Sequence, residues 1–329
     1  MPGAVRGKRV LLAGGAGFIG SHLARALAPD NEVFVVDNLY RQSGRPAWLD
    51  SLPGLRFLHR DVRELAALRA FLPGDLTHVV DLAAVAGVLT VLSAPALATR
   101  SNLEASLAVM DLAAGLRSLE HLVYFSSSEV YGAAALGVAE DELRLQLRLD
   151  EPRWTYAISK LWAEALLFQL RRETGLPVTI VRPFNVYGPG QLGESAVHVF
   201  AHEALAGRPL RVRGPGTQRR AWCFVDDFLA GLMRVLENRP LGLAINLGNP
   251  AAVCSVRELA ELIRAAAGSR SPIEQANPVC EDVAVRVPDI GRAAALGFAP
   301  RVGLAEGLAR TVAWYRSRVD ATPQAQPAG

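Results

Sequence analysis

Cysteine is scarce in this sequence, and it has neither long apolar runs nor an excess of charge of one sign. The three cysteines, Cys223, Cys254 and Cys280, lack metal-ligand spacing and form an odd number, so we interpret them as reduced thiols and expect a cytoplasmic protein. No uninterrupted apolar stretch reaches the roughly 20 residues that span a bilayer. The net charge of +3 comes without a block of Lys and Arg, which argues against nucleic acid and membranes as partners. The N-terminus turns directly into an apolar segment, which is not the pattern of a signal peptide.

Short apolar segments alternate with amphipathic ones over the first half of the chain. Segments that predict buried strands lie at 9–13, 32–37, 55–61, 77–83, 121–127 and 177–183. Segments with helical periodicity follow at 18–27, 63–72, 95–116 and 155–175. Continuous apolar strands that alternate with helices predict an α/β fold, a Rossmann-type doubly wound parallel sheet with helices on both faces.

The alternation of predicted strands and helices ends after Pro183, where glycine and proline become frequent. The segment 223–248 again has the pattern of the first half. We therefore expect a larger domain built from 1–183 and 223–248. A smaller α/β domain is expected from 184–222 and 249–318. The last residues, 319–329, carry too little apolar surface to pack, which predicts a disordered tail.

Three glycines follow the first predicted strand and open a helix. Gly14, Gly17 and Gly20 have the spacing of a dinucleotide fingerprint, and Asp37 ends the second strand. Glycines let the backbone approach a pyrophosphate at the helix N-terminus, and an acid at the position of Asp37 accepts hydrogen bonds from a ribose diol. This pattern predicts binding of NAD rather than NADP, although Arg41 lies close enough in sequence to weaken that preference. Asp61, at the end of the third strand, is either an adenine contact or a solvated loop acid.

Tyr156 and Lys160 lie one helical turn apart in the segment "YAISK". Such a pair is common on helices, but here Ser127 and Ser128 end the preceding strand, onto which this helix packs. A tyrosine ordinarily has a pKa of about 10. A lysine ammonium and a cationic nicotinamide ring would together lower that pKa to about 7. The phenolate would then take a hydroxyl proton while a hydride leaves the same carbon.

The combined motifs resemble the extended short-chain dehydrogenase/reductase family over about residues 8–316. The resemblance rests on the glycine turn with "SSSEVYG" (126–132), "YAISK" (156–160) and "RPFNVYGPG" (182–190). It implies an NAD-dependent epimerase, dehydratase or decarboxylase of nucleotide sugars. Among these, the sequence is most similar to the branch of UDP-glucuronate decarboxylases that form a UDP-4-keto-pentose and of UDP-apiose/xylose synthases.

The resemblance assigns roles to individual residues. Ser127 matches the hydroxyl beside the catalytic tyrosine, with Ser128 next to it; Glu129 matches an active-site glutamate, Arg220 a proton-donating arginine and Asn185 a diphosphate contact. The implied cofactor contacts are Gly14, Gly17, Phe18, Ile19, Gly20, Asp37, Asn38, Asp61, Val62, Leu82, Ala83, Ala84, Asn102, Tyr156, Lys160 and Pro183. The implied substrate contacts are Ala86, Gly87, Thr90, Ser127, Glu129, Asn185, Arg211 and Arg220.

Two departures from the family pattern leave the reaction open. Many relatives that act on UDP-glucuronate carry an arginine where this chain has "VLTVLS" (88–93), and residues 133–153 also differ. Decarboxylation of a nucleotide-linked uronic acid is favoured, with 4,6-dehydration or C4 epimerisation as alternatives and a non-catalytic dinucleotide sensor as a further one. No metal is expected, because His198 and His202 have no third ligand at compatible spacing. Apolar helices at 95–116 and 155–175, which form the dimer interface in relatives, predict a homodimer.

Overall fold

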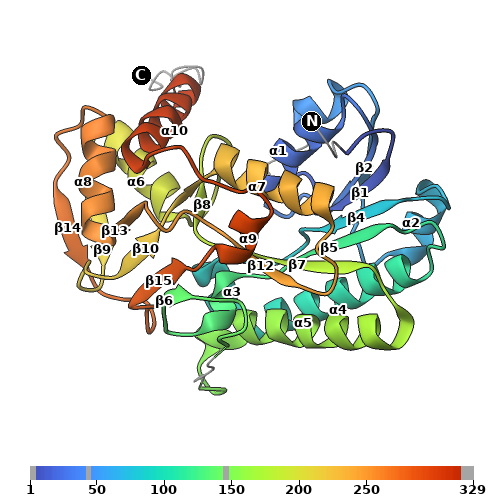
Figure 1. The fold of residues 1–329 in the computed structure, drawn as a ribbon. Helices are drawn as coiled ribbons and strands as arrows, with labels where there is room; N and C mark the ends of the chain where they lie inside the picture. Colours follow the sequence, from blue (N-terminus) through green and yellow to red (C-terminus); the bar gives the residue numbers. More distant parts are fainter. Residues whose placement is uncertain (1–4, 42–45, 144–147, 320–329) are drawn as a thin grey trace.

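The larger part of the molecule is built on one parallel sheet of seven strands (Figure 1). The computed structural model describes residues 5–41, 46–143 and 148–319. The strands run in the order β12-β7-β5-β4-β1-β2-β3, and every neighbouring pair is parallel. Their bounds are β1 Arg9–Ala13, β2 Glu32–Asp37, β3 Leu55–His59, β4 His78–Asp81, β5 His121–Phe125, β7 Val178–Pro183 and β12 Ala244–Leu247.

Helices cover both faces of this sheet, as the apolar strands predict. Helices α1 (Phe18–Leu27) and α7 (Val225–Asn238) lie above it in Figure 1, and α4 (Pro95–Ala114) and α5 (Thr155–Thr174) lie below it. Helix α2 (Leu65–Phe71) packs into the same core as α4 and α5. Successive strand residues face opposite cores: Leu12 packs with α1 and α7, whereas Leu11 packs with α4 and α5. Because these strands are buried on both faces, neither face needs polar side chains, and this explains why their sequences are continuously apolar. The predicted doubly wound fold is confirmed.

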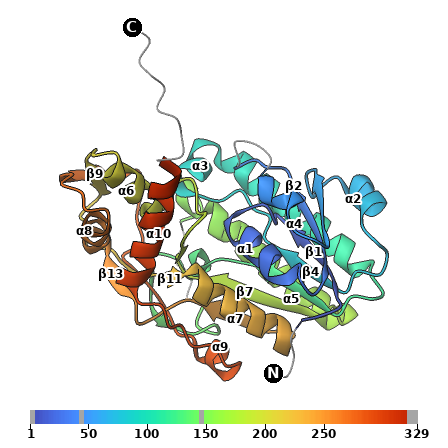
Figure 2. The same cartoon turned by 90° about the horizontal axis from the view of Figure 1, so that it is seen from above.

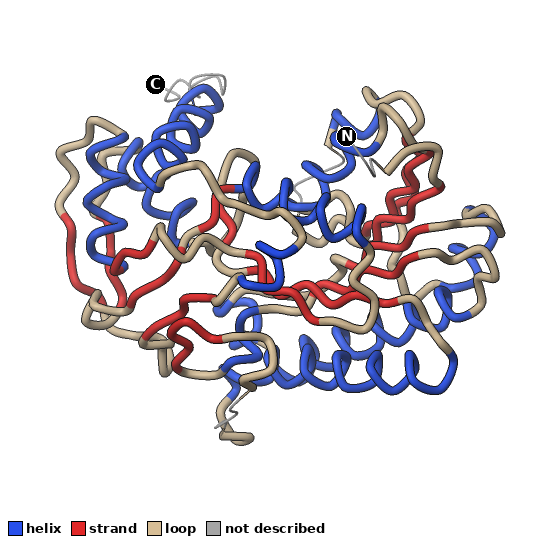
Figure 3. The backbone as a smooth tube through the Cα atoms, viewed as in Figure 1, coloured by secondary structure: helices blue, strands red, loops and turns tan. Residues whose placement is uncertain are grey.

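A smaller unit packs against the carboxyl ends of the large sheet (Figure 2). Its strands form three short sheets, ordered β13-β10-β15-β6, β14-β9 and β11-β8. Figure 3 shows these strands and the helices that surround them. The strand bounds are β6 Ala134–Val138, β8 Val186–Tyr187, β9 Leu210–Arg213, β10 Arg219–Ala221, β11 Cys223–Phe224, β13 Val253–Ser255, β14 Ile273–Ala276 and β15 Val285–Pro288. The helices are α6 Ala196–Leu205, α8 Val256–Ala266, α9 Gly291–Ala295 and α10 Leu304–Val319; a short helix, α3 Val88–Ser93, follows β4.

Two segments differ from the sequence-based expectation. Residues 134–138, expected in the larger domain, form β6 and pair in parallel with β15 of the smaller unit. Val319, expected in the tail, ends helix α10, and residues 320–329 lie outside the described residues. The division into two domains therefore stays a prediction, with this strand crossing between them.

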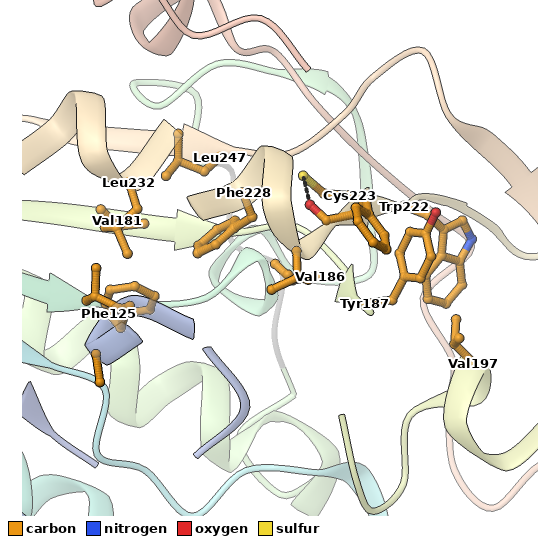
Figure 4. Packing of buried hydrophobic residues seen from close by; sticks show 14 of the residues in the cluster. Phe125, Val181, Val186, Tyr187, Val197, Trp222, Cys223, Phe228, Leu232 and Leu247 are labelled. Carbon is orange, nitrogen blue, oxygen red and sulfur yellow. Dashed lines mark hydrogen bonds between the residues drawn. The ribbon is translucent and has the colours of Figure 1, made fainter. Parts of the chain in front are cut away.

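One apolar core runs from the large sheet into the smaller unit (Figure 4). Phe125 of β5 packs beside Phe228 of α7, with ring centroids 6.1 Å apart. Further along, Tyr187 packs edge-on against both Trp222 and Phe224. The two units thus share buried surface. Over the described ranges, no helix is both long and apolar enough to cross a membrane.

The apolar helices α4 and α5 were expected to form a dimer interface. Leu107 of α4 and Trp162 of α5 are both exposed in the single chain. The homodimer stays a prediction.

A buried polar network joins helix α5 to the sheet. Arg182 of β7 donates to both oxygens of Glu164 on α5, at 3.0 and 2.5 Å, and also to the hydroxyl of Tyr131 at 2.7 Å. Tyr131 in turn donates to the Asn246 side chain on β12, at 2.8 Å. Because buried ions are stable only when they are paired and hydrogen-bonded, this network ties α5, β7 and β12 into one unit.

We predict that Arg182→Ala destabilises the fold by about 3–5 kcal/mol, because it leaves the buried Glu164 carboxylate without its partner. Denaturant unfolding followed by circular dichroism measures this change. The control is Arg208→Ala, which removes a solvent-exposed ion pair with Glu203 and should leave the free energy of unfolding nearly unchanged. Equal losses in the two variants would contradict a role for the network in stability.

Candidate active site

A cavity of about 1380 Å³ lies between the carboxyl ends of the parallel strands and the loops of the smaller unit. This is where ligands bind in open α/β sheets. Most of the residues that the sequence assigns to cofactor or substrate line it. They are Gly14, Gly17, Phe18, Ile19, Gly20, Asp37, Asn38, Asp61, Val62, Leu82, Ala83, Ala84, Ala86, Gly87, Thr90, Asn102, Ser127, Tyr156, Lys160 and Pro183.

The glycine turn between β1 and α1 packs too closely for side chains. Gly14 has φ +73°, and a Cβ atom there would lie 2.8 Å from the backbone nitrogen of Ala83. A Cβ atom on Gly20 would lie 2.6 Å from the Cα atom of Gly15. Gly17 is the N-cap of α1, so the first turn of this helix opens on the cavity. This cradle fits the pyrophosphate of a dinucleotide at a helix N-terminus.

Asp37 ends β2 at the same end of the cavity. Its carboxylate accepts hydrogen bonds from the backbone nitrogens of Leu39 at 2.7 Å and Ala16 at 3.0 Å. Burial raises the pKa of Asp37, and these two hydrogen bonds oppose that rise. Asp37 therefore also holds the glycine turn, a role that the sequence does not reveal.

Asp61 lies in the cavity wall beside Asn38. The Asn38 amide donates to its carboxylate at 3.0 Å. Hydrogen bonds from Arg63 lower the pKa of Asp61 to about 2. Asp61 is thus an ionised acid in a polar cluster.

Tyr156 and Lys160 lie on the first turns of α5, beside the serines that follow β5. The Ser127 hydroxyl accepts from the backbone nitrogen of Glu129 at 3.1 Å, and it lies close enough to Tyr156 to act on the pKa of the phenol. Lys160 donates to the carbonyl of Phe125 at 2.7 Å, and its ammonium lies 6.0 Å from the centroid of the Tyr156 ring. The structure therefore brings together the three groups expected to act on a hydroxyl.

The pKa of Tyr156 differs from the expectation. Burial and the charge of Glu129 raise it to about 12, although Arg41 and Ser127 act to lower it. Burial also lowers the pKa of Lys160 to about 8. The protein groups alone thus do not bring the phenol to neutral pH, because the loss of hydration outweighs the nearby cations.

Glu129 lies outside the cavity lining, where two arginines of low exposure contact it. Arg153 lies 2.8 Å from its Oε2 atom and Arg286 lies 3.2 Å from its Oε1 atom. Burial alone would raise the pKa of Glu129, but these arginines bring it below the usual value. Ser128 accepts a long hydrogen bond from Arg286, at 3.4 Å. Sequence reasoning missed both arginines; "PRW", directly before the tyrosine helix, was the only local signal for Arg153.

Arg220 belongs to the same cluster of charges. It pairs with Asp282, which lines the cavity, at 2.9 Å, and it is close enough to Glu129 for their charges to interact. Burial lowers the pKa of Arg220, Asp282 opposes this change, and Arg286 adds to it. A guanidinium with a lowered pKa is a better proton donor than one in water.

Two predicted substrate contacts point elsewhere. Arg211 is exposed on β9, 3.9 Å from Glu274, whereas Arg213, two residues on, lines the cavity. Asn185 donates to the carbonyl of Ala221 at 2.9 Å and does not line the cavity.

The wall around Gly87 contains a carboxylate that the sequence did not reveal. Glu194 accepts from the backbone nitrogens of Leu89 at 2.7 Å and Thr90 at 2.8 Å. A Cβ atom on Gly87 would lie 3.0 Å from the guanidinium of Arg41. Arg41, expected near the adenosine ribose, therefore points across the cavity toward this wall.

The comparisons with known proteins agree with this geometry. Residues 10–248 match the model of the NAD dependent epimerase/dehydratase family. The chain is 33% identical to UDP-glucuronic acid decarboxylase 5 of Arabidopsis thaliana, over 91% of this chain and 87% of that protein. It is 30% identical to the UDP-glucuronate 4-epimerase of Thermodesulfobacterium geofontis, over 94% and 97%. The NAD-bound dTDP-glucose 4,6-dehydratase DesIV of Streptomyces venezuelae superposes with a TM-score of 0.86 at 31% identity, over 95% and 98%.

The chain belongs to the NAD-dependent epimerase/dehydratase family of extended short-chain dehydrogenases/reductases. It is an NAD-dependent enzyme that modifies nucleotide sugars. The predictions of family, cofactor and enzyme class are confirmed.

We predict that Asp37→Ala weakens NAD binding by about ten- to hundredfold, because it removes a charged hydrogen-bond acceptor. The same change should reduce the difference in affinity between NAD and NADP, since no carboxylate would then repel the 2′-phosphate of NADP. Isothermal titration calorimetry with both nucleotides measures this. Asp37→Asn is the matched control, because it keeps one acceptor for the glycine turn without the charge. Equal affinity of the wild type for the two nucleotides would contradict the role of Asp37.

We predict that Tyr156→Phe lowers turnover by about 10²–10⁴-fold, because the substrate hydroxyl loses its proton acceptor. NAD affinity and the melting temperature should stay close to those of the wild type. Steady-state kinetics and a thermal melt with NAD test this together. Near-normal turnover in this variant would exclude the phenolate as the base.

Proposed function

We propose that this enzyme decarboxylates a nucleotide-linked uronic acid, such as UDP-glucuronate, after transient oxidation at C4. The product is a 4-keto-pentose or, after reduction of the ketone, a pentose. Two of the relatives above are named for UDP-glucuronate, which supports this substrate class.

The observation that carries the proposal is the charge of the cluster around Glu129. Within the described ranges of the chain, three guanidinium groups, of Arg153, Arg220 and Arg286, are paired with two carboxylates, of Glu129 and Asp282. The surplus is one positive charge in a poorly hydrated place beside Tyr156. A uronate carboxylate would neutralise it, whereas a neutral hexose would not.

The active-site groups then have defined tasks in the oxidation. Bound NAD supplies the hydride acceptor, and later the donor, at C4. Tyr156 removes the proton of the C4 hydroxyl, and the ammonium of Lys160 favours its phenolate. Ser127 donates a hydrogen bond to the oxygen that becomes the ketone.

Carbon dioxide leaves in the next step, because the C4 ketone makes the sugar acid a β-keto acid. The bond between C5 and C6 breaks, and its electrons delocalise onto the C4 oxygen as an enolate. Ser127 and Tyr156 stabilise that oxygen by hydrogen bonds. C5 then takes a proton that Arg220 supplies through a bound water, and Glu129 holds the sugar ring.

The same cluster disfavours 4,6-dehydration. That reaction needs a base at C5 and an acid for the departing hydroxyl. Glu129 is a weak base here, because Arg286 and Arg153 lower its pKa. Ser128, next to it, is a hydroxyl and not an acid. The C4 epimerase alternative shares the oxidation step and differs in the product, and a sensor would have no use for Ser127, Tyr156 and Lys160.

The test is to incubate the enzyme with NAD and a panel of nucleotide sugars, with products read by mass spectrometry. We expect UDP-glucuronate to lose the mass of carbon dioxide. Loss of water from a neutral hexose nucleotide would make the protein a dehydratase. An unchanged mass with inverted C4, seen by NMR, would make it an epimerase.

Arg220→Ala should leave oxidation at C4 measurable as reduced cofactor and slow product formation by about 10²-fold or more, because the C5 proton donor is lost. Glu129→Gln should damage the same step while NAD binding is kept. Arg211→Ala, on the exposed side of β9, is the matched control and should leave turnover unchanged. Wild-type rates of product formation in Arg220→Ala would overturn the assignment of the proton donor.

A further inference from the structure

Asp81 is a buried acid at the end of β4 that the reaction as described does not use. Its exposed fraction is 2%, and its backbone is in register with Tyr124 of β5. The carboxylate accepts one hydrogen bond, from the backbone nitrogen of Ala83 at 3.1 Å. A carboxylate buried with one neutral donor requires a cation nearby.

The cation nearby is the ammonium of Lys160, which is also only 2% exposed. It donates to the Phe125 carbonyl and lies 4.8 Å from the ring centroid of Tyr124. Among the residues that the structure describes, no carboxylate lies within ion-pair distance of Lys160. Its charge must therefore be balanced over a longer distance through a poorly hydrated interior, where Coulomb forces are strong.

Two acids act on Lys160, and only one of them is free to balance its charge. Glu164, one turn further along α5, is held on both oxygens by the guanidinium of Arg182. That pair is neutral as a whole. The carboxylate of Asp81 has no arginine partner in the described part of the chain, so its charge and that of Lys160 compensate each other.

We propose that Asp81 is a positioning residue whose carboxylate keeps Lys160 protonated during catalysis. Lys160 can then stabilise the phenolate of Tyr156, the group that takes the substrate proton. This inference rests on the oxidation step of the proposed function and not on the fate of the ketone.

The other groups around this pair are polar but do not compete for its charge. Tyr124 is in register with Asp81, and the ammonium of Lys160 lies over its ring. Burial raises the pKa of Tyr124 well above the usual value, so it stays neutral; its hydroxyl lies 3.3 Å from that of Ser106 on α4. Glu129 and Arg41 act on the pKa of Tyr156 in opposite directions, Glu129 raising it and Arg41 lowering it.

The pKa values support the same assignment. Burial raises the pKa of Asp81 to about 6, with Lys160 opposing that rise. Burial lowers the pKa of Lys160 to about 8, with Asp81 opposing that fall. At pH values between these two pKa values both groups are charged, and this range includes neutral pH.

The test is the pH dependence of C4 oxidation in Asp81→Asn. UDP-xylose is the substrate, because it has no carboxylate to lose, and stopped-flow absorbance of reduced cofactor reports oxidation alone. Removing the carboxylate lowers the pKa of Lys160, so the alkaline limb of the profile should move to lower pH by about one pH unit or more. If the alkaline limb of the Asp81→Asn profile stays at the wild-type pH, the proposal is overturned.

The matched control is Asp227→Asn. Asp227 is also a buried acid and accepts from two backbone nitrogens, those of Arg301 and Val302, far from the catalytic groups. This variant should keep the wild-type alkaline limb whatever it does to stability. An equal shift in both variants would show a general effect of removing buried acids and would also overturn the proposal.

A second measurement does not require Asp81→Asn to fold. Carboxyl-carbon NMR of aspartate-labelled protein, without cofactor, follows the titration of Asp81 in the wild type and in Lys160→Met. Because the coupling of two charges is reciprocal, the Asp81 pKa should rise when the ammonium is removed. An unchanged titration would reject the pairing. If the limb shifts while UDP-glucuronate is not decarboxylated, the proposed function fails and this inference stands.

Discussion

The burial of charge beneath helix α5 is the constraint on which the rest of the active site depends. Tyr156, Lys160 and Glu164 follow one another at single-turn intervals, so all three face the sheet. An interior with three ionisable groups is stable only if each buried charge is paired with an opposite charge or with hydrogen bonds. Arg182 forms an ion pair with Glu164 and also donates a hydrogen bond to Tyr131, which is two residues after Glu129 in the sequence. The interaction that stabilises the helix therefore also fixes the serine segment opposite it.

The same requirement for charge compensation applies around Glu129, with a different outcome. Arg153 comes from the segment before α5, Arg220 from β10 and Arg286 from β15, and all three gather around a carboxylate that follows β5. Beneath α5 the charges balance within the protein. Around Glu129, three arginines of the described chain are paired with two carboxylates, those of Glu129 and Asp282. The stability of the fold and the charge of this cluster thus follow from one electrostatic requirement.

The parts of the molecule that were predictable from sequence are those set by local pattern. Apolar strands, the spacing of Gly14 and Gly20, and the turn between Tyr156 and Lys160 need only neighbours in the chain. Arg286 contacts Glu129 across nearly half the sequence, and no local signal indicates such a contact. Arg211 shows another limit: Arg211 and Arg213 lie on the same face of β9, and only Arg213, at the end of the strand, lines the cavity. Which of the two reaches the cavity depends on where the strand ends relative to the loops of the smaller unit, and no local pattern gives that. The pKa of Tyr156 could not be read from sequence either, because it depends on how much water the fold removes.

The pairing of β6 with β15 makes the two units inseparable. Strand β6 leaves the large sheet's part of the chain at Ala134, joins the small sheet beside residues 285–288, and the chain then returns to form α5. A fragment ending at Pro183 would carry β6 with no strand to pair with and Glu129 without Arg286. The smaller unit on its own would expose the open edge of β15, where another strand could add. The smaller unit therefore cannot be exchanged between relatives as a whole module along a single cut; a chimera needs the segment that contains β6 to be exchanged with it.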